Sequence, residues 1–296
     1  MKKNFVLLGA IIVLTQSCLN LKEINTFANT SDATLKTLDE RNYSFTSSYI
    51  KYTISQTALG VTPQETSSNR FLPPTLKQDN AALKINQEAD RVISLLANSL
   101  QAYLQGIAKL SAPDLVNYDF SKVGENLKGN SQALGLSKVS AADVDAGVKI
   151  SKVLTDGIMS RYREKKLRGV MIDYNTDFQA TAKALATALD ALNENVRRDS
   201  AALFSRYAGV LGNPDLPMTA KLQWRQDYTS ELTELIKKRT TIQRQIQAVE
   251  QLRTAHGEIA SKLATNKLTS KEVIASLKQH SGELKSLFSS IQQLLK

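Results

Sequence analysis

Two long helical segments separated by one sharp break constrain this chain more than any other feature. The break covers residues 209–217, where two glycines and two prolines within nine residues would end almost any helix. On both sides, apolar residues recur mostly every three, four or seven positions, a spacing that places them on one face of a helix. They are Phe178, Leu185, Leu189, Leu192, Val196, Leu203, Tyr207 and Val210 on the first arm, and Tyr228, Leu232, Leu235, Ile242, Ile246, Val249, Ile259 and Leu263 on the second. Residues 170–266 are therefore predicted to form one long helical hairpin.

The remainder of the chain also favours helices over strands. Its 296 residues include only six prolines and 13 glycines, and these cluster rather than scatter, which is typical of long helices. Further helices are predicted at about 77–110, from Ser140, which has capping-box spacing with Asp143, and from Ser270 to the C-terminus. Arms of about 45 residues are roughly 70 Å long at 1.5 Å per residue. The predicted fold is all-α, an elongated antiparallel helical bundle over residues 31–296 built around the hairpin.

Local signals set the expected boundaries of this bundle. Ser31 can cap a first helix, and residues 18–30 before it are polar enough to be a tether. The aromatic stretch 43–54 leaves a strand open as an alternative to a helix. Gly169 costs about 1 kcal/mol inside a helix, so we expect a kink or a short break there, before the first arm of the hairpin.

Residues 1–17 have the organisation of a signal peptide. Two lysines follow the first methionine, and residues 5–14 form an apolar run that is too short to span a bilayer as a helix, which takes about 20 residues. Cys18, the only cysteine in the chain, comes shortly after this run. A cysteine at this place, preceded by the small residue Ser17, resembles the signal of bacterial lipoproteins. Ordinary signal cleavage stays open as an alternative, because Ser17 and Thr15 also suit a cut at the same bond.

The lipoprotein resemblance implies a modification and an address. In that family the cysteine is lipidated and becomes the first mature residue, so Cys18 is the predicted lipidation site and the attachment to the membrane. The family's inner-membrane retention signal is typically Asp at the next position, whereas this chain has Leu19. The resemblance therefore implies the periplasmic side of the outer membrane. Under ordinary cleavage, the protein is expected to be secreted or soluble in the periplasm.

The chain is basic, with a net charge of +10 from 38 basic and 28 acidic residues. A basic balance is compatible with nucleic acid, but this charge is spread along helices and fits an acidic envelope surface as well, so no nucleic-acid partner is predicted. One cluster within residues 161–168 is a candidate contact with lipid headgroups or other acidic surfaces, although a solvated helix face is the simpler interpretation. The cluster consists of Arg161, Arg163, Lys165, Lys166 and Arg168.

No pattern in the sequence indicates catalysis, a cofactor or a metal site. A single cysteine excludes cysteine-rich zinc sites and intramolecular disulfides. His256 and His280 fall on the apolar seams of their predicted helices, and would need carboxylates such as Glu258 or Glu283 to hold a metal. Half-buried rings at the edge of each seam are the expected arrangement, with a pH-sensitive seam as the other hypothesis. Trp224 is predicted to pack against the loop at the hairpin tip.

Without a catalytic motif, the expected function is structural. We expect a non-enzymatic lipoprotein of the cell envelope that acts as a helical scaffold or protein-binding module, with another envelope protein as its partner. The irregular residues 112–139 are the first candidate for the partner contact, because long loops in compact domains tend to be functional. The alternative is a membrane-perturbing helical protein of the pore-forming-toxin type. The two differ in whether replacement of Cys18 releases the protein from membranes.

Overall fold

A computed structural model of the chain describes residues 21–53, 81–112, 140–152, 163–266 and 270–296. Within these ranges every regular element is a helix, so the prediction of an all-α fold is confirmed. The elements with defined bounds are α2 (Phe45–Ser48), the π-helix η1 (Tyr49–Thr53), α5 (Ala81–Ser111), α7 (Ala141–Lys152), α8 (Arg163–Asp173), α9 (Asn175–Leu211), α10 (Met218–Thr265) and α11 (Lys271–Leu295). None of the helices in the described residues is both long enough and apolar enough to cross a membrane.

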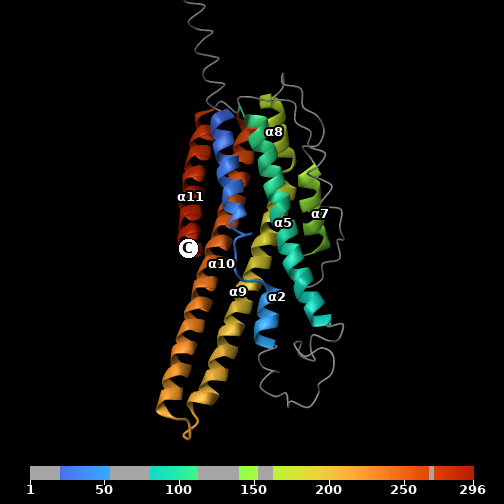
Figure 1. The fold of residues 1–296 in the computed structure, drawn as a ribbon. Helices are drawn as coiled ribbons and strands as arrows, with labels where there is room; N and C mark the ends of the chain where they lie inside the picture. The colour runs from blue at the N-terminus through green and yellow to red at the C-terminus, as the bar shows by residue number, and fades with distance from the viewer. Residues whose placement is uncertain (1–20, 54–80, 113–139, 153–162, 267–269) are drawn as a thin grey trace, which may run out of the picture.

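Helices α9 and α10 form the long antiparallel hairpin that the apolar spacing predicts (Figure 1). The tip lies between Leu211 and Met218, inside the predicted break. Gly212 ends α9 by donating its N–H to the carbonyl oxygen of Ala208 at 3.0 Å. With 48 residues, α10 is about 72 Å long at 1.5 Å per residue. The tip extends well beyond the ends of the other helices, which gives the molecule its elongated shape (Figure 1).

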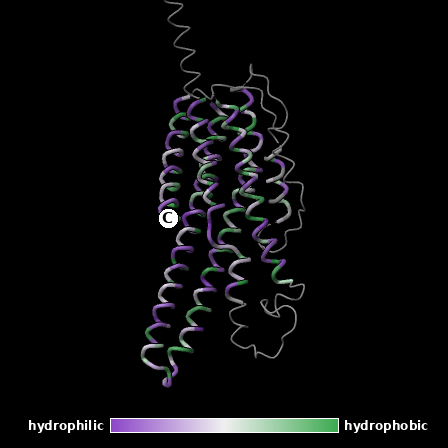
Figure 2. Tube along the Cα trace, viewed as in Figure 1, coloured by the Kyte–Doolittle hydropathy of each residue, from purple (hydrophilic) through white to green (hydrophobic). Residues whose placement is uncertain are grey.

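A seam of buried apolar side chains joins the two arms. Hydrophobic and hydrophilic residues alternate along each helix, as one-sided burial requires (Figure 2). Leu192 of α9 and Ile259 of α10 are both fully buried, and burial of such a side chain stabilises the fold by about 1.5–3 kcal/mol. Toward the tip the seam becomes aromatic, because the ring of Tyr207 lies 5.6 Å from that of Trp224 and 5.3 Å from that of Tyr228. Trp224 therefore packs against Tyr207 of the opposite arm, and its predicted contact with the tip loop stays a prediction.

The other helices pack around the base of the hairpin, the end opposite its tip. Helices α5 and α7 lie against α9, helices α8 and α11 lie against α10, and the short α2 contacts both α5 and α9. In Figure 1, α11 runs back from the base along α10 and ends partway to the tip. The distal part of the hairpin therefore has fewer helical neighbours than its base.

Residues 21–36 form a helix, which corrects the prediction of a tether over residues 18–30. Ile24, Phe27 and Ala28 are fully buried in the core. The sequence does not indicate this helix, because its few apolar residues are set among polar ones and form no repeating stripe over several turns. Their burial depends on helices far along the chain, which local composition does not reveal.

The predicted helix start at Ser31 is also wrong. Ser31 lies inside the helix, fully buried, and its hydroxyl donates to the carbonyl oxygen of Phe27 at 2.7 Å. After a turn, α2 and η1 occupy most of the aromatic stretch 43–54, so the strand alternative is wrong for the described residues. The carboxylate of Asp90 in α5 accepts the first two N–H groups of α2, each at 2.9 Å, which favours a helix start at this point.

The break expected at Gly169 lies five residues later. Helix α8 continues through Gly169, and the distortion falls at Tyr174, between α8 and α9. Leu167 and Val170, on either side of the glycine, are buried, and their burial outweighs a propensity cost of about 1 kcal/mol. The distortion is mild, because the N–H of Tyr174 still donates to the carbonyl oxygen of Val170 at 3.2 Å.

Unlike Ser31, Ser140 and Ser270 do cap the helices that are predicted to begin at them. At the start of α7, the N–H of Ser140 donates to Oδ2 of Asp143 at 2.9 Å, and the N–H of Asp143 donates back to the Ser140 hydroxyl at 3.3 Å. At the start of α11, the N–H of Val273 donates to the Ser270 hydroxyl at 3.3 Å. These contacts satisfy N–H groups that have no partner within the helix.

Candidate functional site

The basic cluster predicted to contact acidic surfaces divides into two parts. Lys165 and Lys166 are exposed on α8, which begins at Arg163, while Arg161 lies outside the described residues. Arg168 instead points to the last turn of α10, where its guanidinium donates to two carbonyl oxygens at 2.7 and 3.1 Å. A cation is favoured there because the C-terminal carbonyl groups of a helix lack partners and carry partial negative charge. Arg168 therefore has a structural role, and the two lysines are the described side chains that suit an external contact.

His256 is fully buried, which corrects the expectation of a half-buried ring. Its ring stacks on Phe178 with the centroids 3.9 Å apart. Nε2 lies 2.9 Å from the hydroxyl oxygen of Tyr103, and Nδ1 lies 3.0 Å from Oδ1 of Asn175. Because the amide oxygen can only accept, Nδ1 carries the proton and the tyrosine hydroxyl donates to Nε2. Burial lowers the pKa of His256 to about 3, so the ring is neutral near pH 7.

His280 is also buried, but between two carboxylates. Its Nε2 and Nδ1 atoms each lie 3.0 Å from a carboxylate oxygen, of Glu258 and Glu283 respectively. Hydrogen bonds from Lys262 and Ser276 hold the pKa of Glu258 at about 2, so this carboxylate is charged. The cluster is a buried polar network that joins α11 to α10.

The two histidines therefore belong to separate sites. His256 contacts side chains of α5 and α9, whereas His280 contacts carboxylates of α10 and α11. Glu258 and Glu283, the carboxylates considered as metal ligands from the sequence, both contact the ring nitrogens of His280. Across the part of the chain that the structure describes, no group of three or more His, Cys, Asp or Glu side chains could hold a metal ion.

A second buried polar cluster joins residues 43–53 to α9. Oδ2 of Asp199 accepts the hydroxyl protons of Tyr43 at 2.5 Å and Ser48 at 2.6 Å. Nδ2 of Asn195 donates to the oxygen atoms of the same two hydroxyls, at 3.0 and 2.6 Å. Burial raises the pKa of Asp199, while the two hydroxyl donors oppose that rise. Since Tyr43, Ser48 and Asp199 are all buried, the cluster positions the short helices α2 and η1 and leaves no room for a substrate.

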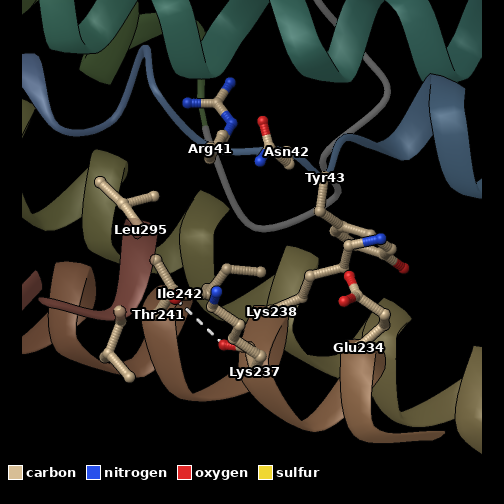
Figure 3. A pocket seen from close by; sticks show the side chains of 10 residues that line it. Arg41, Asn42, Tyr43, Glu234, Lys237, Lys238, Thr241, Ile242 and Leu295 are labelled. Atoms are coloured by element: carbon tan, nitrogen blue, oxygen red, sulfur yellow. Dashed lines mark hydrogen bonds between the residues drawn. The ribbon is translucent and has the colours of Figure 1, made fainter. Parts of the chain in front are cut away.

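A small cavity lies beside this cluster (Figure 3). Residues 41–43, α10 and the end of α11 form its wall, with Arg41, Lys237, Lys238 and Glu234 as its charged groups. Its volume of about 60 Å³ accommodates a few water molecules and is far below the roughly 300–1,000 Å³ of small-molecule sites. The cavity is therefore a packing gap between elements, with no capacity for a metabolite.

The distal part of the hairpin exposes large apolar side chains. Phe204 on α9 is 60% exposed, and Met218, Leu222 and Ile236 on α10 are 71, 50 and 56% exposed. Single exposed apolar residues are common on protein surfaces, but Phe204, Met218 and Leu222 share one narrow two-helix arm, and Ile236 lies just before the arm begins. Apolar surface that gathers in this way is typical of interaction sites.

An ion-pair cluster also lies on the distal arm. Oε1 of Glu231 accepts from Arg206 at 2.7 Å and from the Tyr207 hydroxyl at 2.9 Å. Nζ of Lys51, in η1, lies 3.1 Å from Oε2 of the same carboxylate. Glu231 therefore connects α9, α10 and η1 at the point where the hairpin leaves the other described helices.

Some of the sites expected from the sequence lie outside the described residues, among them Cys18 and residues 113–139 of the candidate contact loop. Lipidation and the loop contact therefore stay predictions. The exposed apolar residues of the distal arm were not predicted as an interaction site. A signal was present, because Phe204 and Ile236 both lie beside the apolar seams of their helices and therefore outside the expected core. Comparison with protein families, curated proteins and solved structures finds no match for this chain.

Proposed function

We propose that this chain is a non-enzymatic lipoprotein of the cell envelope, anchored by lipid at Cys18, which acts as a helical scaffold or protein-binding module. The observation that carries the proposal is that the start of the first described helix and the hairpin tip lie at opposite ends of the molecule. The helix of residues 21–36, with which the described part of the chain begins, starts at the base of the bundle, and the hairpin tip lies at the opposite end (Figure 1). A lipid on Cys18 would hold the base at the membrane and present the arm away from it.

The position of the basic residues on α8 supports this orientation. Helix α8, with exposed Lys165 and Lys166, lies at the same end of the molecule as residue 21 (Figure 1). Lysines near a membrane surface are attracted by anionic headgroups, with a contribution of about 1 kcal/mol each. The cluster considered from the sequence as a headgroup contact would then face the membrane in which the lipid is embedded.

The burial of the unusual polar groups supports a binding role over a catalytic one. His256 and Asp199, the groups with the most unusual environments, are enclosed by hydrogen-bonded neighbours from other helices. Catalytic acids and bases have to reach a substrate, and neither group does so in the described structure. The exposed surface of the arm offers helix faces, which suit recognition of another protein.

The test of this proposal compares the membrane attachment of the wild type and of Cys18→Ala, with palmitate labelling of both. We expect the wild type to incorporate label and to fractionate with the outer membrane, and Cys18→Ala to be unlabelled and released. The double variant Lys165→Ala/Lys166→Ala is the matched control, since it removes the headgroup contact and keeps the lipid. If Cys18→Ala stays membrane-bound, the anchor proposal is wrong and the affinity lies in the helical bundle itself.

A further inference from the structure

We propose that one side of the distal hairpin is a docking face for an acidic amphipathic helix of a partner protein. The proposal deepens the binding role above and rests on it for the setting in the cell envelope. The docking face combines four exposed apolar residues with a basic rim. Its members are Phe204, Met218, Leu222 and Ile236, with Lys221, Arg225 and Arg239 as the rim.

The residues of α10 that form the docking face are separated by whole turns. Met218 and Leu222 are four residues apart, and Ile236 follows Leu222 by fourteen. Because each residue turns a helix by about 100°, these spacings return to nearly the same direction. Arg225 follows Met218 by seven residues, and Arg239 follows Arg225 by fourteen. The apolar and the basic positions therefore form two adjacent rows along the same side of α10.

Phe204 lies on the same side of the hairpin as those two rows. It follows the buried Leu203 and precedes the buried Tyr207, so it lies about 80° past the seam direction of α9, counted along the chain. Met218 and Leu222 lie about 100–140° past the seam of α10, taken from Trp224 and Tyr228, in the same sense. In antiparallel helices, rotation in the same sense about each axis leads to the same side of the pair. The docking face thus includes residues of both helices.

The acidic residues of distal α10 lie on a different side. Asp227, Glu231 and Glu234 are the acidic residues between Met218 and Arg239, and their spacings of four and three residues place them together. Their common direction differs by about 140–180° from that of Leu222 and Ile236. Glu231 is already engaged by Arg206 and by the hydroxyl of Tyr207. The docking face is therefore basic on the side nearer α9, while Asp227 and Glu231 point away from it and Glu234 lies at its opposite margin.

A shallow hollow runs along α10 next to the docking face. Its volume is about 540 Å³, and its surface is mostly apolar although most of the residues that line it are polar. The lining residues are Leu222, Arg225, Gln226, Thr229, Ser230, Thr233 and Glu234. The apolar residues thus alternate with hydroxyl and guanidinium groups over about 27 Å of helix, the rise from Met218 to Ile236 at 1.5 Å per residue. That length matches about five turns of a second helix laid alongside.

Charge and patterning identify the occupant. A helix that fits has apolar residues spaced by three or four to meet Phe204, Leu222 and Ile236, and carboxylates to meet the basic rim. A second copy of this chain would bring its own Lys221 and Arg225 against the same cations, which like-charge repulsion disfavours. A bilayer requires a continuous apolar stripe, and Arg225, Thr229 and Thr233 interrupt the one on α10. A partner helix with an apolar stripe and with Asp and Glu at its margins matches both the apolar residues and the basic residues of the docking face.

The test places a photo-crosslinking amino acid at Gln226, inside the hollow, in the full chain expressed in its own cells. The matched control places it at Asp227, the next residue, which is also exposed but lies on the acidic side. We expect Gln226 to crosslink one envelope protein at an acidic helix, mapped by mass spectrometry, and Asp227 to give none. Leu222→Ser and Arg225→Glu should each lower the adduct at least tenfold. With both proteins purified, affinity should fall with added salt.

Other outcomes overturn the proposal. An adduct of twice the chain mass identifies a second copy as the occupant. The purified chain without residues 1–18 can also be tested for binding to phosphatidylglycerol vesicles. If it binds and Leu222→Ser abolishes the binding, the occupant of the docking face is a membrane. Equal amounts of adduct from Gln226 and Asp227, or no adduct from either position, would show that this surface is not a docking face. The anchor proposal fails separately, because release by Cys18→Ala is measured without reference to the arm.

Discussion

A neutral histidine enclosed by Tyr103, Phe178 and Asn175 links the stability of the fold to pH. In the unfolded chain, His256 takes up a proton near its ordinary pKa of about 6.5, whereas in the folded chain burial lowers its pKa to about 3. Its contribution to stability is therefore complete above about pH 6.5 and is lost as the pH falls toward 3. The expected loss is small near pH 7 and approaches about 1.4 kcal/mol per pH unit below about pH 6, measured by urea unfolding at pH 7, 6 and 5.

The comparison that isolates this effect is His256→Gln, which keeps an amide donor and an acceptor but cannot titrate. The variant should be less stable at pH 7, because the stacking on Phe178 and the fit in the core are impaired. Its stability should nevertheless fall less steeply with pH than that of the wild type. Equal slopes for the two proteins would mean that the folded state accepts a proton at His256 as readily as the unfolded state.

Single side chains in the core show where sequence reasoning reaches its limit. The seam position of His256 was visible from spacing, but its burial was not, because Tyr103 lies 153 residues earlier in the chain. The contacts of Asp199 with Tyr43 and Ser48 span 156 and 151 residues and have no local signal at all. Polar groups of this kind are specified by tertiary packing, so they emerge only when the helices are placed.

Helix ends give the next prediction, because Arg168 caps α10 from outside that helix. Arg168→Ala removes two hydrogen bonds to carbonyl groups and a cation from a helix C-terminus, so it should lower the free energy of unfolding by about 1–2 kcal/mol. Lys166→Ala, two residues away and exposed, should change it by less than about 0.5 kcal/mol. Chemical denaturation of the two variants measures both values. Equal effects would show that the guanidinium contacts contribute no more than a surface charge.

The helices themselves were largely predictable, for identifiable reasons. The hairpin was evident because its apolar repeat extends over many turns and its turn contains two glycines and two prolines, and the caps at Ser140 and Ser270 follow short, local rules. The helix at residues 21–36 was missed because its apolar face is short and depends on distant neighbours. The predicted break at Gly169 is wrong because the helix-propensity cost of a glycine, about 1 kcal/mol, is smaller than the free energy gained by burying the residues beside it.

The shape of the molecule is a prediction that scattering can check. A compact chain of this length has a radius of gyration of about 19 Å, whereas α10 alone extends for about 72 Å. Small-angle X-ray scattering of the chain without residues 1–18 should give a maximum dimension above about 70 Å and a radius of gyration clearly above the compact value. A radius near 19 Å would mean that the hairpin folds back on the bundle in solution.

The two ends of the chain are hydrogen-bonded into the same structure. Gln245 donates to the carbonyl oxygen of Thr37 at 2.8 Å across 208 residues, and Gln292 donates to Glu40 at 3.1 Å across 252 residues. Ribosomes add about 5–20 residues per second, so Thr37 and Glu40 emerge roughly ten seconds or more before Gln245 and Gln292 are synthesised. Until then this end of the chain lacks native partners, which exposes it to aggregation or to binding by a chaperone. A frameshift or early stop near the end of the coding sequence would consequently appear as a defect at the beginning of the protein.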